Sequence, residues 1–218
     1  CISRKIIFSK KIHEAELSKL IENTQRDLNI ALMNEIMILC KRAKLDFNEV
    51  VKLANTKWNF LKFKPGLVGG HCLPVDPYYL SYFADKLNFN TKVTLAGRET
   101  NNSMENFIFQ KISAKIKKII NLKKKNITIL GLTYKPNVSD LRNSLAINIY
   151  KKLKNKFSNV NAYDPIIEKE IAYQNNIYVK FNKKKNSDIF ISLVNHKEIV
   201  KVLSFAKKNK KIIIDPFS

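Results

Sequence analysis

The glycines and prolines of this chain are few and concentrated, and their distribution limits where regular structure can run. Three of the five glycines and three of the six prolines fall within residues 65–80, PGLVGGHCLPVDPYYL. This segment is therefore expected to be an irregular loop, whereas the long stretches on either side can form continuous helices or strands. The same loop contains Cys72, one of only three cysteines in the chain.

The first half of the chain has a helical pattern. Residues 14–43 lack glycine and proline, and their apolar residues recur at helical spacing, which predicts a helix of about 45 Å. Past Ile30 this helix is apolar nearly all round, which indicates burial either in a core or between two subunits. Further helices are expected over residues 45–55, 76–88 and 94–126, the last with a bend near Gly97.

The pattern changes at Ile127. Residues 127–130 form a short β-branched run that ends at Gly131, which is typical of a buried parallel strand. Strand and helix patterns then alternate to the end of the chain, which predicts a doubly wound parallel sheet in an α/β fold. The expected strands are 160–165, 177–181 (at an edge), 187–195 and 210–216, and the expected helices are 144–155 and 197–209.

Composition narrows the classes of function. No apolar run reaches the roughly 18 residues of a membrane span. The three cysteines, Cys1, Cys40 and Cys72, are odd in number and widely spaced, which favours a reducing cytoplasm and argues against a metal site. The net charge of +22 would suit a nucleic-acid partner, but only five of the 40 basic residues are arginine and the lysine runs are scattered, so none is expected.

The first strand of the α/β half does not lead into a dinucleotide fingerprint. A G-x-G-x-x-G turn lets a diphosphate approach the backbone, whereas LGLTYKPNVSDLR offers one glycine. Lys135 stands where a phosphate-binding turn would be, and it is either a phosphate ligand or a solvated lysine. Asp164 fits a ribose-binding acid by position, but equally a turn at Asp-Pro.

The loop around Cys72 suits either a nucleophile or a structural cysteine. Gly69 and Gly70 precede it without side chains, which permits a positive φ or close packing against bare backbone. Pro74 and Pro77 stiffen the segment that follows, so that Cys72 would be held in a fixed position. The alternative is a buried cysteine in a tight turn.

Three polar residues lie on nearly one stripe of the helix over residues 14–43. Lys19 and Asn23 are one helical turn apart, and Arg26 follows one position short of the next turn. Their side chains either converge on a ligand or form a solvated face.

Four stretches of this sequence resemble, in order, the UDP-glucose/GDP-mannose dehydrogenase family: AELSKLIENTQRDLNIALMNE, FKPGLVGGHCLPVDPYYL, AGRETNNSM and ILGLTYKPNVSDLRNS. The segment VGGHCLPVDPYYL, with TKWN at residues 56–59 ahead of it, is most similar to the bacterial UDP-N-acetylhexosamine 6-dehydrogenase branch. The family oxidises C6 of a nucleotide-sugar from alcohol to carboxylate and reduces two NAD.

The resemblance also implies a domain organisation. Family members have an NAD-binding Rossmann domain, a helical central domain that forms the dimer, and a Rossmann-like UDP-binding domain, and this sequence resembles only the last two. The expected divisions are 1–10 (the end of an NAD-binding domain, with residues 4–9 as its last strand), 11–108 (central), 109–126 (connecting helix) and 127–218 (UDP-binding). A homodimer through helix 14–43 and a chain inactive by itself are implied.

The resemblance further assigns roles to residues of this chain. Cys72 matches the nucleophile, which forms a thiohemiacetal and then a thioester at C6 of the sugar. Lys19 matches the lysine that stabilises oxyanions, Asn23 the amide that assists it, and Asp76 the acid that orients water or Lys19.

Substrate and cofactor contacts follow from the same resemblance. Lys135 matches the ligand of the UDP phosphates, and Arg142 an arginine near the NAD phosphates or at the domain junction. Contacts with the substrate are also expected for Arg26, Gly66, Gly69 and Gly70. The segment NTKWNFLKF lacks the arginine of the UDP-glucose branch, which favours an N-acetylated hexosamine, and the end IIIDPFS lacks an arginine that many relatives carry. The alternative function is a non-catalytic module that binds a UDP-sugar or another polyanion.

Overall fold

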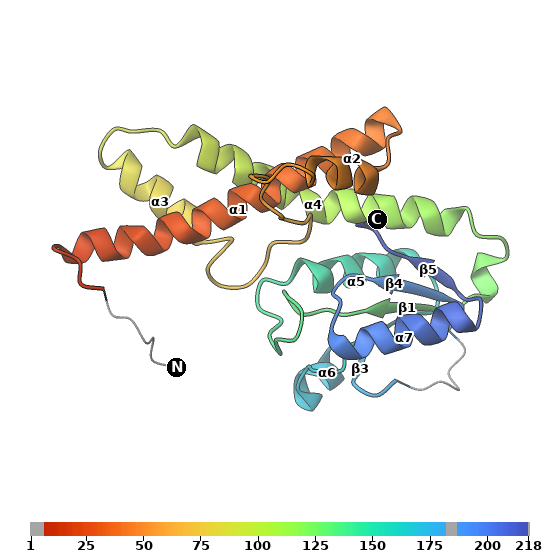
Figure 1. Cartoon of the computed structure of the whole chain (residues 1–218). Coiled ribbons are helices and arrows are strands. Elements are labelled where there is room, and N and C mark those ends of the chain that lie inside the picture. The colour runs from red at the N-terminus through yellow and green to blue at the C-terminus, as the bar shows by residue number, and fades with distance from the viewer. Residues whose placement is uncertain (1–6, 182–186, 218) are drawn as a thin grey trace.

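In the computed structural model, which describes residues 7–181 and 187–217, a group of long helices lies against an α/β unit (Figure 1). The strand expected over residues 4–9 falls partly outside the described residues, and residues 7–9 contain neither helix nor strand. The expected order of a helical half followed by a parallel α/β half is confirmed.

Within residues 7–126, the helical half contains four α-helices. These are α1 (Ile12–Ala43), α2 (Phe47–Ala54), α3 (Asp76–Asp85) and α4 (Lys92–Lys117). Helix α1 packs along both α3 and α4. Gly97 lies inside α4, where it allows α1 to pack closely. A Cβ at this position would stand only 2.3 Å from the side chain of Leu28 on α1. The helix expected to continue to residue 126 ends earlier, at Lys117, and a short 3₁₀ turn, η1 (Leu122–Lys124), follows it.

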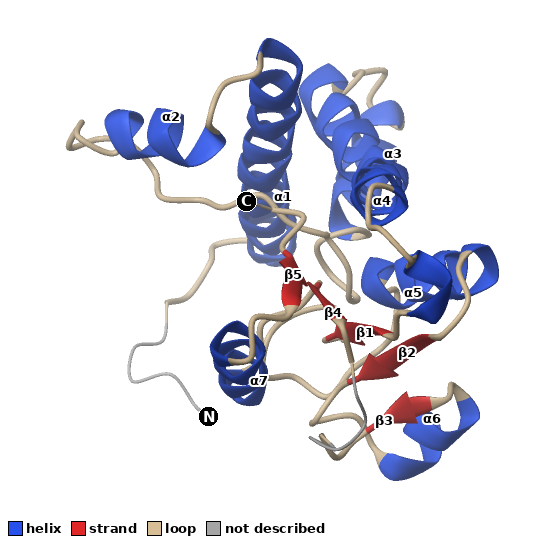
Figure 2. Cartoon of the chain, turned by 90° about the vertical axis from the view of Figure 1, so that its right-hand side faces the viewer, coloured by secondary structure: helices blue, strands red, loops and turns tan. Residues whose placement is uncertain are grey.

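The α/β half is a five-stranded parallel sheet in the order β3-β2-β1-β4-β5. Helices α5 and α7 lie on opposite faces of it (Figure 2), which confirms the doubly wound fold. The short helix α6 has no counterpart among the expected elements. The strands are β1 (Ile127–Leu130), β2 (Val160–Tyr163), β3 (Ile177–Tyr178), β4 (Ile189–Ser192) and β5 (Ile212–Ile214), and the helices are α5 (Leu145–Lys156), α6 (Lys169–Gln174) and α7 (Lys197–Lys208).

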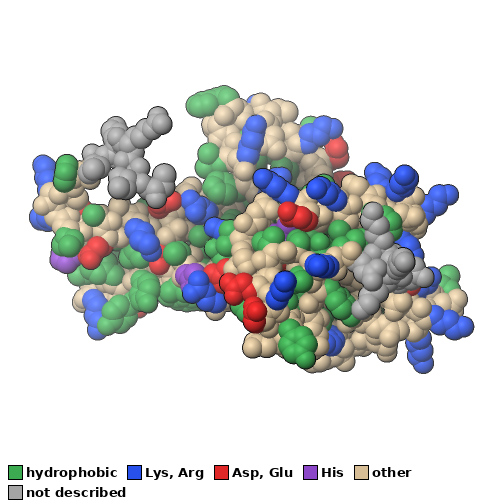
Figure 3. All heavy atoms as spheres, turned by 90° about the horizontal axis from the view of Figure 1, so that it is seen from below, with side chains coloured by type: hydrophobic (Ala, Val, Ile, Leu, Met, Phe, Trp, Pro, Cys, Tyr) green, Lys and Arg blue, Asp and Glu red, His purple; other side chains and the backbone are tan. Residues whose placement is uncertain are grey.

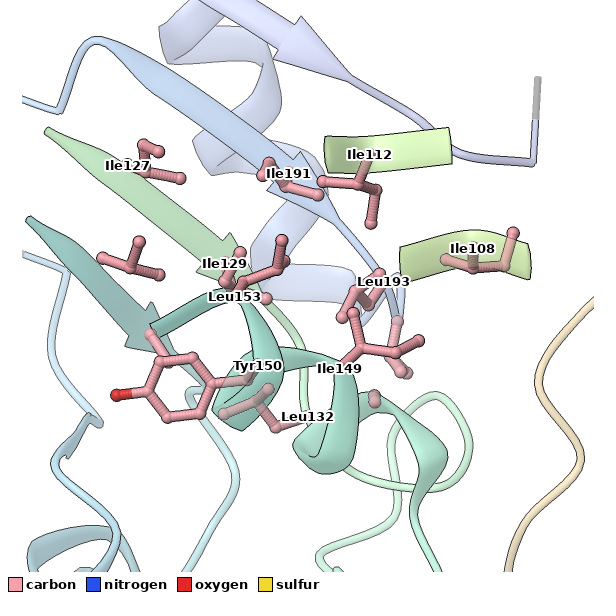
Figure 4. Packing of buried hydrophobic residues seen from close by; sticks show 14 of the residues in the cluster. Ile108, Ile112, Ile127, Ile129, Leu132, Ile149, Tyr150, Leu153, Ile191 and Leu193 are labelled. Atoms are coloured by element: carbon pink, nitrogen blue, oxygen red, sulfur yellow. The ribbon is translucent and has the colours of Figure 1, made fainter. Parts of the chain in front are cut away.

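The two faces of the sheet have separate cores. Ile127 and Ile129 of β1 belong to a cluster that includes Ile149 of α5 and Ile108 and Ile112 of α4 (Figure 4). The strand residues that alternate with these point to the other face of the sheet, toward α7. This second cluster includes Leu130, Tyr163, Phe190, Ile199, Val202 and Ala206. The second half of α4 therefore belongs to the core of the α/β unit, while its first half packs on α1.

Helix α1 differs from the expectation of burial on most sides. Leu32 and Leu39 are 56% and 57% exposed, whereas Asp27 and Asn34 are fully buried. The buried side of α1 is therefore partly polar, and an apolar stripe faces outward from this chain. Of the two interpretations of this stripe, burial between subunits remains a prediction.

Gly131, at the end of β1, is required by the fold. Its φ is +77°, and an added Cβ would stand 2.0 Å from the carbonyl oxygen of Val194. We expect Gly131→Ala to lower the free energy of unfolding by about 1–3 kcal/mol, measured by urea denaturation. Gly66→Ala is the matched control because nothing lies within 4 Å of a Cβ at that position. Equal losses in the two variants would contradict the steric explanation.

Candidate active site

Helix α1 and the start of α3 bring together three polar side chains that are far apart in the sequence. Lys19 Nζ and Asn23 Nδ2 each donate a hydrogen bond of 2.6 Å to Oδ2 of Asp76. Asp76 is only 4% exposed, and it begins α3 directly after the Cys72 loop (residues 65–75). Arg26 does not join this cluster, because its guanidinium pairs with Glu22 at 3.0 Å on the outer side of α1.

Cys72 lies beside this cluster. Its carbonyl oxygen accepts hydrogen bonds from the N–H groups of Val75 (3.0 Å) and Asp76 (2.8 Å), so a tight turn connects it to α3. The pKa of Lys19 is raised, first by the hydrogen bond to Asp76, and the charges of Asp76 and Cys72 contribute. Cys72 is exposed, which is inconsistent with a buried structural cysteine. A thiol, an ammonium, an amide and a carboxylate therefore share one site.

The glycines before Cys72 pack against the chain itself. A Cβ on Gly69 would stand 2.6 Å from the carbonyl oxygen of Asn143, and one on Gly70, where φ is +88°, 2.7 Å from the ring of Tyr134. Asn143 Nδ2 also donates to the carbonyl oxygen of Gly70 at 3.1 Å. Both predicted properties, positive φ and close packing, are present, and the partner is the β1–α5 loop (residues 131–144).

A second charged cluster joins the same two loops. The guanidinium of Arg142 donates to both carboxylate oxygens of Asp140, from Nε at 3.0 and 3.2 Å and from Nη2 at 2.9 Å. His71 Nε2 lies 3.1 Å from Oδ2 of Asp140. These hydrogen bonds, above all those of Arg142, hold the pKa of Asp140 well below its usual range. Arg142 is 72% exposed, so its free face is open to solvent.

The lowered pKa of Asp140 predicts a pH dependence of stability. The folded-state pKa lies below the unfolded value of about 3.9, so the contribution of this carboxylate is present above that pH and is lost as the pH falls below it. We expect the wild type to be more stable than Asp140→Asn at pH 6, and this difference to shrink below about pH 4. Urea midpoints at several pH values measure it; a constant difference would contradict the prediction.

A cavity of about 560 Å³ lies between the two halves, next to the Cys72 loop. It is found at the carboxyl ends of β1, β4 and β5, where open α/β sheets commonly bind ligands. Its polar lining includes Lys64, Thr133, Lys135, Ser144, Asn195 and Asp215. Gly66 and Gly69 line the same cavity, so the structure brings Lys135 and these two glycines around one space.

Sequence reasoning missed a buried polar network under the loop. The amide of Asn34 holds the backbone of Gly66 by two hydrogen bonds, donating to its carbonyl oxygen at 3.0 Å and accepting from its N–H at 2.9 Å. Asn34 also donates to Asn101 on α4 at 2.8 Å, and Asn101 donates to Asp27 at 2.7 Å. The signal that could have found it is the helical spacing of Asn23, Asp27 and Asn34.

Asp164 has a structural role, so the interpretation as a ribose-binding acid is wrong. It is fully buried, and it accepts hydrogen bonds from the N–H of Leu132 at 2.7 Å and from His196 Nε2 at 3.0 Å. The N–H of Asn137 donates to His196 Nδ1 at 2.9 Å, which leaves Nε2 as the protonated nitrogen. The alternative of a turn is confirmed, since Oδ1 of Asp164 accepts from the N–H of Ile166.

The first βα turn of the sheet does not fit the diphosphate of a dinucleotide. The carbonyl oxygen of Val194 fills the space beside Gly131, since it would stand 2.0 Å from a Cβ there, and the N–H groups of Leu132 and Thr133 point to the carboxylate of Asp164. The backbone donors that would cradle a phosphate are therefore already paired. Among the described residues no group of three or more His, Cys, Asp or Glu side chains could hold a metal ion, and no helix of that part is long and apolar enough to cross a membrane.

Comparison with known proteins agrees with this architecture. Residues 13–103 match the model of the UDP-glucose/GDP-mannose dehydrogenase family, central domain, and residues 128–218 match the UDP binding domain of the same family. The chain belongs to this family. The family and the fold expected from the sequence are thus confirmed.

Three relatives of this chain are dehydrogenases whose names specify N-acetylated UDP-sugars. The chain is 41% identical to a UDP-N-acetyl-D-glucosamine 6-dehydrogenase of Salmonella typhi over 193 residues (87% of this chain, 45% of the relative). It is 38% identical to a UDP-N-acetyl-D-mannosamine dehydrogenase of Campylobacter jejuni (87% and 47%). A structure of a UDP-D-ManNAc dehydrogenase from Pyrococcus horikoshii matches with a TM-score of 0.78 and 31% identity (97% and 50%). The chain therefore spans about half the length of these relatives.

Proposed function

We propose that this family member supplies the substrate-binding and thiol-bearing part of an NAD-dependent UDP-N-acetylhexosamine 6-dehydrogenase. The convergence of Lys19, Asn23 and Asp76 beside the exposed Cys72 is the observation that carries this proposal. The names of the relatives support the substrate class.

The chemistry needs a sulfur nucleophile at C6 of the sugar. Arg142 is the residue of this chain predicted to approach the phosphates of NAD, which would supply the hydride acceptor for each of the two oxidations at C6. The Cys72 thiolate adds to the C6 aldehyde left by the first oxidation, a C–S bond forms, and the aldehyde oxygen takes a proton from Lys19 to become the hydroxyl of a thiohemiacetal. Removal of the second hydride, with return of the hydroxyl proton to Lys19, gives a thioester. Water then adds, the C–S bond breaks, and the uronic acid leaves while Cys72 is regenerated.

The neighbours of Cys72 have separate tasks in this scheme. Lys19, a cation at neutral pH whose pKa is raised further by its hydrogen bond to Asp76, stabilises the negative charge that develops on the C6 oxygen. Asn23 donates its amide N–H to the same region. Asp76, which both side chains bind, orients them and accepts a proton from the attacking water.

Lys135 and the cavity that it lines are the proposed site of the UDP group. A volume of about 560 Å³ is within the usual range of small-molecule sites. Gly66 leaves open space on the loop side, because nothing lies within 4 Å of its missing Cβ. For Arg142, contact with the NAD phosphates stays a prediction, and the position of Arg26 on the outer side of α1 gives its substrate contact no support.

A homodimer is the proposed assembly, and the cytoplasm the proposed location. The outward stripe of α1 (Ile21, Leu32 and Leu39) is exposed, as are several aromatic side chains of α3. On the face shown in Figure 3, hydrophobic side chains gather at the left end of the molecule, which α3 and the start of α1 form. Two copies that cover this surface would bury apolar area that this chain leaves in water.

A binding experiment tests the site on this chain without any cofactor. We expect Lys135→Ala to weaken UDP binding by tenfold to a hundredfold, measured by isothermal titration calorimetry, because a charge-assisted hydrogen bond contributes about 1.5–3 kcal/mol. Lys207→Ala, in the last turn of α7, is the control. Equal weakening in both variants would instead favour the alternative function, a module that binds polyanions through its general positive charge.

A further inference from the structure

We propose that His71 is a positioning residue, which holds the Cys72 loop against the β1–α5 loop through its hydrogen bond to Asp140. The position of the Cys72 thiol is then set from both halves of the molecule. The value of this arrangement for catalysis rests on the proposed function, but the arrangement itself does not. We refer to the hydrogen-bonded group of His71, Asp140 and Arg142 as the latch.

The geometry of Asp140 makes it a fixed anchor. Its Oδ1 accepts hydrogen bonds from the N–H of Arg142 at 2.9 Å and from its Nε at 3.0 Å, so the β1–α5 loop holds the carboxylate independently of His71. The side chain of Asp140 is only 14% exposed. It is an ionised carboxylate at neutral pH and can only accept, so the 3.1 Å contact requires a proton on His71 Nε2.

The latch acts on the residue directly before Cys72. On the upstream side, the carbonyl oxygen of Gly70 accepts from Asn143, and the ring of Tyr134 packs on the same glycine. On the downstream side, the carbonyl oxygen of Cys72 accepts from Val75 and Asp76. His71 lies between these two anchored points. Without its hydrogen bond, the peptide that carries the thiol is free to rotate.

The charged groups around Cys72 give this rotation a measurable consequence. Lys19 faces it from α1 and Asp76 from the start of α3, while His71, Asp140 and Arg142 lie on the side of the β1–α5 loop. A thiol that moves away from the ammonium of Lys19 loses a neighbour that favours the thiolate. Release of the latch should therefore alter the pH dependence of the reactivity of Cys72.

The test uses this chain alone. Alkylation of Cys72 by iodoacetamide is followed between pH 6 and 10 by mass spectrometry of its peptide, with hydrogen exchange of the loop amides. We expect His71→Leu to change the pH profile of the alkylation rate, with slower alkylation near neutral pH, and to speed exchange at residues 70–76 about fivefold. His71→Gln keeps an N–H near the position of Nε2 and should restore both properties.

Two further variants complete the test. His13→Leu is the control, because it breaks a similar contact, 3.0 Å from Glu16 on the first turns of α1, and should change neither readout. Asp140→Ala should reproduce the effect of His71→Leu, and the double variant should add little to either. A wild-type profile in His71→Leu, or a glutamine variant as altered as the leucine variant, would overturn the proposal.

These outcomes are separable from those of the proposed function. Alkylation and exchange need neither nucleotide-sugar nor NAD, so they report on the latch even if no oxidation is ever detected. Conversely, if sugar oxidation is observed but His71→Leu leaves both readouts unchanged, the latch is wrong and the dehydrogenase stands.

Discussion

Replacement of Cys72 by serine is expected to reduce oxidation of the UDP-sugar to its uronic acid by at least about a thousandfold. A serine hydroxyl does not ionise near neutral pH, so in the proposed mechanism the C6 aldehyde would not be captured and the thioester could not form. The measurement is NADH formation with UDP-GlcNAc and UDP-ManNAc, on an enzyme that carries these residues together with a dinucleotide-binding domain. An aldehyde trap such as hydroxylamine should recover the product of the first oxidation.

Cys40→Ser is the matched control. Cys40 is buried on α1, so its replacement should lower stability but leave turnover within about a few fold of the wild type. If Cys72→Ser retained a substantial part of the wild-type rate, the assigned nucleophile would be wrong. An equal loss in the Cys40 variant would mean that the assay reports general damage to the fold.

Replacement of Arg98 by methionine is expected to lower the free energy of unfolding by about 3–5 kcal/mol, because it leaves a buried carboxylate without its cation. Arg98 Nη1 donates to Oδ1 of the fully buried Asp27 at 2.6 Å. Burial raises the pKa of Asp27, and Arg98 and Asn101 oppose that rise. In the variant the pKa rises further, so the loss should be smaller at acidic pH, where Asp27 is protonated. Urea denaturation at pH 5 and pH 8 measures both effects.

Two comparisons separate this explanation from simple loss of packing. The double variant Asp27→Leu with Arg98→Met removes both charges and should be much less destabilised than the single variant. Arg26→Met breaks a similar contact, 3.0 Å from Glu22, at the surface of α1, and should change stability by less than about 1 kcal/mol. A double variant as unstable as Arg98→Met would contradict the role of the unpaired charge.

The architecture of the α/β half could be predicted because parallel strands that are covered on both faces are nearly continuous apolar runs. Ile127–Leu130 and Ile189–Ser192 are such runs, and all their residues are buried. The limits of α4 could not be predicted in the same way. The lysine-rich segment past Lys117 keeps a helical pattern, but Asn121 takes a left-handed conformation there (φ 57°).

The candidate site was only partly accessible from the sequence. The spacing of Lys19 and Asn23 places them on one face of a helix, but their meeting with Asp76 depends on how α1 packs on α3, and local pattern does not contain that information. Arg26 was expected on the same stripe. It follows Asn23 by three positions instead of four, and this offset around the helix axis turns its side chain to solvent. The buried polar face of Asp27 and Asn34 was missed because apolar periodicity treats a polar residue as an interruption of the core.

Helix α4 has a mechanical consequence for the whole molecule. Its first half packs on α1 and its second half contributes Ile108 and Ile112 to the core of the sheet. One continuous helix is therefore part of both halves of the molecule. If either half of the molecule unfolded, the part of α4 packed in that half would lose its partners, and the helix would be destabilised for the other half as well. Heating should therefore give a single cooperative transition instead of two successive ones.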